Sequence, residues 1–390
     1  MVKMGLMGKR MLKRLVRRLR PPVSTPSPQV VNNHFPFELP TRWWYQFHNS
    51  EASVSLALRD LCRPGDVAFD VGCWVGDVTM LMSRLVGPNG RVCAFEANPH
   101  ILPPLTNNLG LNLCNNVSLV HGAVWQSSGE YLTFYLPDDR HWESWAGLYC
   151  RDFRQTVQVK SVALDDFIAD TGLKPAVIKM DIEGAERDAL QGMPNFLESG
   201  RPYLVLEQIN RNMNCVEFLS RYGYRALDLS NYRRIRSAAD CLENSVVRNL
   251  LFLPEERIDQ TPYPREVVLG ERNEVSGSEF DTTVPGVAKA EIAVEKGRYL
   301  CELDFGWSDP ATRVLIRCVA GGQNRYQIEG ANEWVFKSYR DFVLDVADDG
   351  TCAVECHSIG GQPLRDVRVR SFQYSKVLNH RGAPDNYFVV

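Results

Sequence analysis

Residues 69–76 read FDVGCWVG, and they continue an apolar run that begins at Val67. Asp70 ends that run, and Gly72 and Gly76 follow it. Two spaced glycines directly after a buried strand indicate a tight backbone turn that another group approaches closely. The acid indicates that this group carries positive charge or hydrogen-bond donors. The stretch therefore predicts a ligand-binding loop at the end of a strand.

Strand-like and helical segments alternate on both sides of this loop. Strand-like runs occupy 66–70, 91–95, 117–121, 176–180 and 203–207, and helical runs occupy 77–86, 99–110, 163–171, 185–191 and 214–221. The alternation predicts an α/β fold with a doubly wound parallel sheet covered by helices. β-rich runs at 130–136 and 156–162 interrupt it, and 246–253 could add a late strand at the sheet edge.

The character of the sequence changes after Pro254. From about residue 265, short alternating runs replace the helical period, at 288–294, 298–305, 312–318, 341–346, 351–357 and 366–374. Turn residues separate these runs, so they predict an all-β sandwich or jelly roll. We expect three regions: a basic helix and linker at 1–40, an α/β domain at 41–260 and a β-sandwich domain at 265–390.

Composition and charge are those of an ordinary globular protein. The chain has 390 residues and a net charge of −3, so its overall charge gives no sign of a nucleic-acid partner. Its 11 cysteines have no framework spacing, which favours a reducing, cytoplasmic environment. Cys352 and Cys356, beside His357, have strand spacing and predict two core thiols rather than a metal site.

The N-terminal segment has a pattern of its own. Residues 1–37 contain no acid, and residues 4–20 combine Met and Leu at helical spacing with Lys and Arg. This pattern predicts a basic amphipathic helix that Pro21 and Pro22 end. A solvated tail and a helix lying on an anionic membrane surface both fit, and in a eukaryote a transit peptide fits as well. No run is long and apolar enough to span a membrane.

The next strand, RVCAFE, ends in a second acid, Glu96. An acid at this position typically accepts both hydroxyls of a ribose. The glycine loop is not GxGxxG, and Asp70 and Asp77 flank its glycines. An acidic loop is a poor cradle for pyrophosphate. It suits S-adenosylmethionine, which carries a sulfonium, an ammonium and a ribose, so a methyltransferase is favoured over a dehydrogenase.

Five stretches together resemble the FkbM family of S-adenosylmethionine-dependent methyltransferases. They are DVAFDVGCWVGDVTMLMS, VCAFEANP, NNLGLNLCNNVSLVHGAV, LDDFI and AVIKMDIEGAERDALQGM, in this order, within about residues 65–210. IKMDIEGAE is the most distinctive piece. The resemblance implies a class I methyltransferase fold, S-adenosylmethionine as cofactor, and O-methylation, often of sugars or secondary metabolites.

By position, the resemblance also implies a set of cofactor-binding residues. They are Asp70, Gly72 and Gly76 in the loop, Glu96 at the ribose, and Asn98 and Ala123, within the His121–Val124 stretch, on the adenosine side. The sequence departs from the family pattern at Cys73, Trp74 and Ala97. None of these departures removes a functional group.

A hydroxyl acceptor benefits from a base that takes its proton during attack. Asp181 and Glu183 follow the strand AVIKM, and Glu207 ends the strand YLVLE. Asp181 could be the base, and Asp181 with Glu183 could instead hold a divalent metal, although lone carboxylates make a weak ligand set and we expect no metal. The alternative for Asp181 and Glu183 is helix capping, and for Glu207 a structural acid at a strand end.

His141 is a further candidate base, in the loop PDDRHWESWAGL. Aromatic faces and carboxylates in this loop suit a sugar ring, and an ordinary exposed loop fits equally. We predict an O-methyltransferase acting on a sugar or glycan hydroxyl, with the β-sandwich binding glycan or holding an oligomer together. The alternatives are a small secondary metabolite as acceptor, or an inactive cofactor-binding module with a recognition domain.

Overall fold

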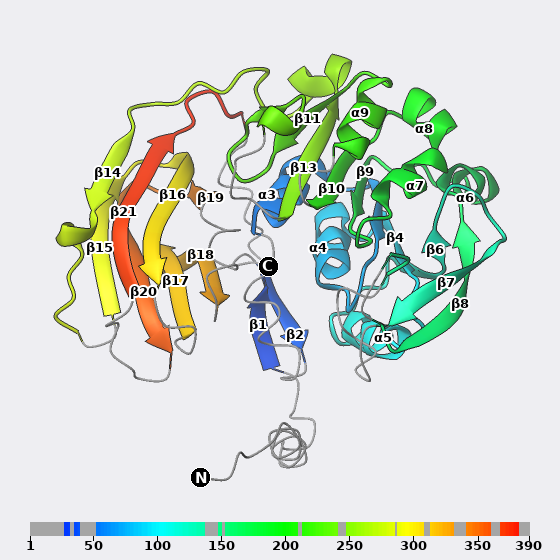
Figure 1. Ribbon diagram of the computed structural model, residues 1–390, viewed down its shortest axis with the longest axis horizontal. Helices are drawn as coiled ribbons and strands as arrows, with labels where there is room; N and C mark the ends of the chain where they lie inside the picture. The colour runs from blue at the N-terminus through cyan, green and yellow to red at the C-terminus, as the bar shows by residue number, and fades with distance from the viewer. Residues whose placement is uncertain are drawn as a thin grey trace, which may run out of the picture.

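The computed structural model describes residues 27–31, 35–39, 52–136, 147–149, 153–209, 213–240, 247–284, 287–307, 313–330, 341–359 and 367–381. An α/β body and a β-sandwich lie side by side, with α3 (Ala52–Leu61) between them (Figure 1). A separate hairpin of β1 (Ser27–Val31) and β2 (Phe35–Leu39) contacts α5 (Leu102–Leu111) through β2.

An eight-stranded sheet forms the centre of the α/β body, in the order β12-β11-β13-β10-β9-β3-β4-β5. The strands are β3 (Val67–Val71), β4 (Arg91–Glu96), β5 (Val117–His121), β9 (Val177–Met180), β10 (Tyr203–Ile209), β11 (Tyr224–Asp228), β12 (Arg234–Ile235) and β13 (Val247–Pro254). Five neighbouring strands of this sheet, β10, β9, β3, β4 and β5, are parallel. In the sheet, β4 and β5 follow on one side of β3, and β9 and β10 follow on its other side. The carboxyl end of β3 is therefore the switch point where ligands bind in such sheets.

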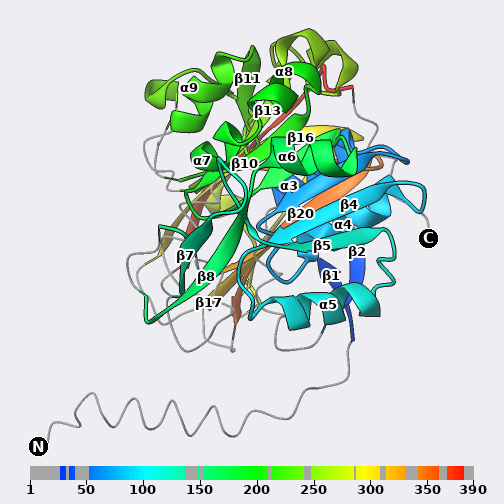
Figure 2. The same ribbon diagram turned by 90° about the vertical axis from the view of Figure 1, so that its right-hand side faces the viewer.

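Helices cover both faces of this sheet (Figure 2). One layer holds α3, α4 (Asp77–Val86) and α5, and the other holds α6 (Leu164–Thr171), α7 (Glu186–Gln191), α8 (Pro194–Ser199) and α9 (Asn214–Ser220). Because side chains alternate along a strand, β3 serves both layers. Ala68 is buried in the core under α3 and α4, and Phe69 in the core under α6 to α9. The prediction of a doubly wound α/β sheet is confirmed.

The position of β13 corrects an expectation. We expected 246–253 at the sheet edge, and the strand lies instead between β10 and β11, antiparallel to both. Leu250, Leu251, Phe252 and Leu253 are all buried. Such a continuous apolar run is typical of an interior strand that is covered on both faces. The sequence patterns also missed β11, β12 and α8.

A smaller three-stranded sheet interrupts the alternation, as the sequence indicated. It has the order β6-β8-β7, with β6 (Ala123–Val124), β7 (Tyr131–Leu136) and β8 (Gln155–Val162). Phe134, Leu136 and Val159 form a small apolar cluster with Ala123. This sheet therefore follows directly from the end of β5 and carries Ala123 beside the switch point.

The C-terminal part is a β-sandwich of two four-stranded antiparallel sheets, which confirms the predicted fold class. One sheet has the order β14-β21-β16-β19, with β14 (Asn273–Ser276), β16 (Gly297–Trp307), β19 (Asp341–Val346) and β21 (Val367–Lys376). The other has the order β15-β20-β17-β18, with β15 (Val287–Val294), β17 (Arg313–Ala320), β18 (Gln323–Gly330) and β20 (Gly350–Ile359). Both sheets contribute to one apolar core, which contains Cys352 and Cys356 as predicted. His357 Nε2 lies 2.8 Å from Glu355 Oε2.

A buried network of charges joins the sandwich to the α/β body. Arg298 of β16 donates to Asp345 of β19, with Nε–Oδ1 at 2.6 Å and Nη2–Oδ2 at 2.9 Å, and also to Asp60 of α3. Arg59 of α3 pairs with Asp345. Burial would raise the pKa of Asp345, but Arg298 and Arg59 lower it to about 2. Val343 of β19 also packs into the apolar core that contains α3.

Candidate functional site

A pocket opens at the carboxyl ends of β3, β4 and β9. Its empty volume is about 600 Å³, which includes the part that is open to solvent. The predicted residues that line it are Gly72, Glu96, Asn98, Ala123, Asp181 and Glu183. The fold therefore brings the expected cofactor side and the expected acceptor side of the site into one cavity, at the switch point of the sheet.

Gly72 is required where the loops after β3 and β9 touch. Its φ is +78°, and a Cβ atom there would lie 1.9 Å from the carbonyl oxygen of Asp181. Gly76, with φ +92°, does not line the pocket; a Cβ atom there would lie 2.6 Å from Leu105 Cδ1 of α5. Gly72 thus allows the loop after β3 to contact the loop after β9, and Gly76 allows the start of α4 to approach α5.

Asp70 lies beneath the glycine loop and does not line the pocket. It is fully buried; its Oδ2 accepts a hydrogen bond of 2.5 Å from Thr79 Oγ1, and its Oδ1 lies 4.0 Å from Lys179 Nζ. Burial raises the pKa of Asp70, and the charge of Lys179 acts in the opposite direction. The geometry gives Asp70 a bracing role that ties the loop to α4 and β9, while direct contact with the cofactor stays a prediction.

Glu96 is buried at the tip of β4 and is held by two backbone donors. The N–H of Trp74 donates to Oε2 at 2.8 Å, and the N–H of Asn98 donates to Oε1 at 2.7 Å. Burial raises the pKa of Glu96 to about 7, against the effect of these two donors. A carboxylate offers about four lone-pair sites, so both oxygens keep capacity to accept further hydrogen bonds.

Two non-glycine residues with left-handed backbone lie in the wall of the pocket. Trp74 has φ 46° and Glu183 has φ 56°. A bulky residue in this region costs free energy and persists only where the surrounding structure holds it. Gly184 follows Glu183 with φ 98°, so the loop after β9 turns sharply and returns toward α7.

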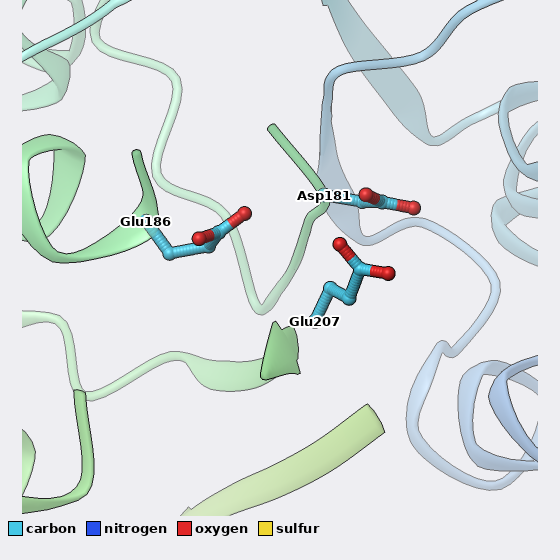
Figure 3. Close-up of side chains that lie close together, drawn as sticks. All are labelled: Asp181, Glu186 and Glu207. Atoms are coloured by element: carbon cyan, nitrogen blue, oxygen red, sulfur yellow. The ribbon is translucent and has the colours of Figure 1, made fainter. Parts of the chain in front are cut away.

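Three carboxylates converge beside this loop (Figure 3). Asp181 follows β9, Glu207 lies on β10 and Glu186 begins α7, and a carboxylate oxygen from each lies within 4.8 Å of those of the other two. Lys179 Nζ lies 3.3 Å from Asp181 Oδ2. Because β9 and β10 are parallel neighbours, their carboxyl ends bring Asp181 and Glu207 together.

The helix-capping alternative for Asp181 and Glu183 does not hold, because α7 has Ala185 at its N-cap and no side-chain cap hydrogen bond. Glu186 instead holds the loop that precedes the helix. Its Oε1 accepts hydrogen bonds from the N–H of Ile182 at 2.9 Å and of Gly184 at 3.3 Å. Burial raises the pKa of Glu186 to about 7, and these donors act against that shift. The sequence did not single out Glu186, although its crowding with the other charges of IKMDIEGAE was a usable signal.

His141, with Glu143 and Trp145, lies outside the described residues. The next described residues, 147–149, lie beside the pocket, where a Cβ atom on Gly147 would be 3.2 Å from Glu183 Cβ. Tyr149 is half exposed; its hydroxyl donates to Asp188 Oδ2 at 2.7 Å, and its ring centroid lies 6.3 Å from that of Trp125. The sequence patterns did not point to this aromatic pair.

Residues 69–226 match the family described as the methyltransferase FkbM domain. This segment is an FkbM methyltransferase domain. Its boundaries enclose the glycine loop, Glu96 and the carboxylate cluster, and the resemblance seen in the sequence motifs is confirmed. S-adenosylmethionine is the cofactor of the domain.

The FkbM domain is similar to named proteins over part of the chain. The hexuronic acid methyltransferase AglP of Haloferax volcanii is 28% identical over 158 residues, which cover 40% of this chain and 62% of that protein. This chain thus spans less than two thirds of that relative.

Two solved structures are also similar. The precorrin-6y C5,15-methyltransferase of Geobacter metallireducens has a TM-score of 0.32 and 16% identity, over 52% of this chain and 85% of that chain. The methyltransferase FkbM of Methylobacillus flagellatus has a TM-score of 0.32 and 17% identity, over 51% of this chain and 50% of that chain.

The residues of the pocket fit S-adenosylmethionine. Glu96 retains acceptor capacity for ribose hydroxyls, and the apolar side chains of Phe95, Ile101 and Val124 line the same cavity. The carboxylates Asp181, Glu186 and Glu207 offer hard oxygen ligands of the kind that Mg²⁺ and Ca²⁺ use. The metal alternative weighed from the sequence paired Asp181 with Glu183, and Glu183 is not a member of this cluster.

Proposed function

We propose that the chain is an S-adenosylmethionine-dependent O-methyltransferase whose acceptor is a hydroxyl of a sugar, most simply within a glycan. The observation that carries this proposal is the single pocket shared by Glu96, at the expected ribose position, and by Asp181 and Glu183. Such a pocket can bind a cofactor and expose an acceptor to a carboxylate at the same time.

The protein contributes mainly position and a proton acceptor. When bound, S-adenosylmethionine supplies a methyl group on a sulfonium, whose carbon–sulfur bond breaks as the new carbon–oxygen bond forms. The acceptor hydroxyl must lose its proton, and an ionised carboxylate in the pocket wall can take it. Asp181 is the first candidate because its side chain is 26% exposed and lies in the wall. Glu207 and His141 are the other candidates.

A sugar acceptor rests on two kinds of support. The relative AglP is named a hexuronic acid methyltransferase, although the matched segment is only 62% of that protein. In this chain, the half-exposed ring of Tyr149 lies beside Trp125, and the Tyr149 hydroxyl is held by Asp188. Aromatic faces flanked by carboxylates suit a sugar ring, because its C–H surface packs on the ring and its hydroxyls need acceptors.

Isotope-labelled S-adenosylmethionine tests the function. We expect label to pass from it to a hexuronic-acid oligosaccharide incubated with the full chain. A neutral oligosaccharide and a small phenolic metabolite run in parallel identify the acceptor class. Label in the phenol alone would replace the sugar by a secondary metabolite. Cofactor binding without transfer to any of the three would favour the inactive recognition module.

Asp181→Asn tests the base. The variant keeps the shape of the side chain but loses its proton affinity, so turnover should fall by about 10²–10⁴ while cofactor binding persists. The matched control is Asp170→Asn, an exposed acid on α6. Near-normal turnover would move the role to Glu207 or His141. Activity that a chelator abolishes and magnesium restores would assign the carboxylates to a metal instead.

Two further roles extend this proposal. The β-sandwich would bind glycan or join copies of the chain, and residues 4–20 would hold the enzyme on the inner face of an anionic membrane. Residues 4–20 lie outside the described part of the chain. No helix among the described residues is long and apolar enough to cross a membrane.

A further inference from the structure

A second hollow, which we call the arginine groove, lies at the β12 edge of the large sheet. Its lining includes Arg225, Arg233, Arg234, Arg236 and Arg265, together with Glu266. Its empty volume is about 1160 Å³, which includes the part that is open to solvent. None of its residues lines the pocket of Glu96, so the groove is a separate feature of the α/β body.

Strand pairing explains why the arginines gather. Leu227 of β11 pairs with Arg234 of β12, and Ala226 pairs with Ile235. Because paired residues share a face and alternate residues return to it, Arg225, Leu227, Arg234 and Arg236 belong to one face. The opposite face carries Ala226 and Ile235, which are buried in the core under α9. Residues 264–267 close the groove from the side.

The turn that presents Arg233 is braced from within. Asp228 is buried; its Oδ1 accepts from the N–H of Ser230 at 3.0 Å and from the Ser230 hydroxyl at 2.7 Å. The N–H of Tyr232 donates to the carbonyl of Asp228 at 2.7 Å, and Tyr232 has φ 57°. These bonds hold the backbone of the turn that carries Arg233 to the groove.

Carboxylates balance only part of this positive charge. Glu255 is shared by Arg225, with Nη2–Oε2 at 2.9 Å, and Arg234, with Nη2–Oε1 at 3.3 Å, and Arg265 pairs with Asp259 at 2.8 Å. Arg233 and Arg236 are exposed and form no ion pair within the described residues. Arg381, which pairs with Asp259 at 3.6 Å, and Asp240, whose Oδ2 accepts from the backbone N–H of Arg236 at 2.8 Å, add one charge of each sign. Six arginines set against Asp240, Glu255, Asp259 and Glu266 leave a net charge of +2 (6 − 4). The pKa of Arg234 is lowered, first by partial burial and then by the charges of Arg225 and Arg236.

We propose that the arginine groove binds a phosphate-bearing ligand. The guanidinium fork matches the oxygens of phosphate and carboxylate. A phosphate monoester carries a charge of about −1.5 to −2 at neutral pH, so one such group neutralises the net positive charge of the groove. One carboxylate, with a charge of −1, would neutralise only half of it. The groove is open to solvent, so a sugar or another group attached to the phosphate can extend out of it.

Titration of the full chain with inorganic pyrophosphate, followed by calorimetry, tests the groove. Arg233→Ala with Arg236→Ala removes the two groove arginines that form no ion pair with another described residue, and should raise the pyrophosphate Kd by at least about tenfold. The matched control is Arg221→Ala with Arg370→Ala, which removes the same charge from exposed sites outside the groove. Binding of S-adenosylmethionine, measured in parallel, shows that each variant is folded.

Retention of pyrophosphate by the control variant, and its loss from the groove variant, would support the site. Displacement of pyrophosphate by glucose 1-phosphate would assign a soluble source, and displacement by vesicles that contain phosphatidic acid, a lipid phosphate monoester, would assign a lipid headgroup. Absence of pyrophosphate binding by the unmodified chain would overturn the proposal. Equal weakening in both double variants would overturn it too, because the effect would then follow from overall charge alone.

Discussion

At the scale of single residues, Glu96 is a buried acid in the wall of the pocket. Burial raises its pKa to about 7, so it is mostly neutral below that pH and ionised above it. For a carboxyl group whose folded-state pKa is raised, burial costs stability at high pH. That cost is relieved as the pH falls through about 7 toward the ordinary value of 4.5.

The same titration should control cofactor affinity. With Glu96 at the ribose, as predicted, its ionised form would accept both hydroxyls and attract a cationic ligand, so the affinity for S-adenosylmethionine should rise as the pH increases through about 7. Glu96→Gln should remove this dependence and weaken binding by about 1.5–3 kcal/mol at high pH. Calorimetry across the pH range measures both effects.

Neighbouring groups make the variant comparison necessary. Asp77 and Glu186 also have raised pKa values, about 6 and about 7, each caused first by burial. A pH dependence that survives in Glu96→Gln would belong to one of them. An unchanged dissociation constant in the folded variant would refute the ribose assignment.

At the scale of elements, the site depends on the contact between the loops that follow β3 and β9. Gly72 places its Cα against the carbonyl oxygen of Asp181, so any side chain there would push the loops apart. Gly72→Ala should therefore lower the free energy of unfolding by about 1–3 kcal/mol and should also weaken cofactor binding. Chemical denaturation and calorimetry measure the two effects.

The matched control for this change is Gly172→Ala. Gly172 has φ +70°, close to the +78° of Gly72, but no atom lies within 4 Å of the Cβ that would be added. The control should show only the cost of the left-handed backbone, about 1 kcal/mol, and normal cofactor binding. Equal effects from both substitutions would show that the contact with Asp181 is unimportant.

At the scale of the whole molecule, the α/β body and the sandwich are joined by buried charges. Asp345→Ala would leave Arg298 and Arg59 without their shared carboxylate. Breaking a buried pair from one side typically costs about 3–5 kcal/mol, so the free energy of unfolding should fall by this amount. The control is Asp304→Ala, which removes a partner of Arg370 in an exposed pair and should cost at most about 1 kcal/mol.

The sign of the pH effect at this joint is fixed by the lowered pKa values. The pKa of Asp345 is lowered to about 2, and the pKa of Asp60 is also lowered, in both cases because the charge of Arg298 outweighs the effect of burial. Their stabilising contribution is complete above the unfolded pKa near 4, and is lost as the pH falls toward 2. If Asp345→Ala proved as stable as the control variant, the network would not hold the two parts together.

The N-terminal hypothesis also belongs to this scale. Deleting residues 1–20 should release the protein from anionic liposomes and leave activity on a soluble acceptor unchanged. Binding of the full chain should weaken as salt rises, because the attraction of Lys and Arg to the surface is screened. Full-length protein that ignores anionic liposomes at low salt would show that this segment is only a tail.

Much of the molecule follows from local sequence. The alternation of strands and helices, the loop after β3 and the short strands after residue 265 all depend on neighbours in the chain, which periodicity records. The place of Glu96 at the end of β4 follows in the same way, since an acid at the tip of the second strand has a fixed place in such a sheet. These features needed no knowledge of distant contacts.

Tertiary structure decided the rest, because the order of strands in a sheet and the meeting of side chains from different strands depend on residues far apart in the chain. Only the sheet shows that β13 inserts between β10 and β11, since an apolar run does not reveal its neighbours. Only the parallel pairing of β9 with β10 brings Asp181 to Glu207, and only the fold of the loop after β9 brings the backbone of Ile182 to the Glu186 carboxylate. The arginine groove likewise exists only once β11 pairs with β12 and residues 264–267 fold against them.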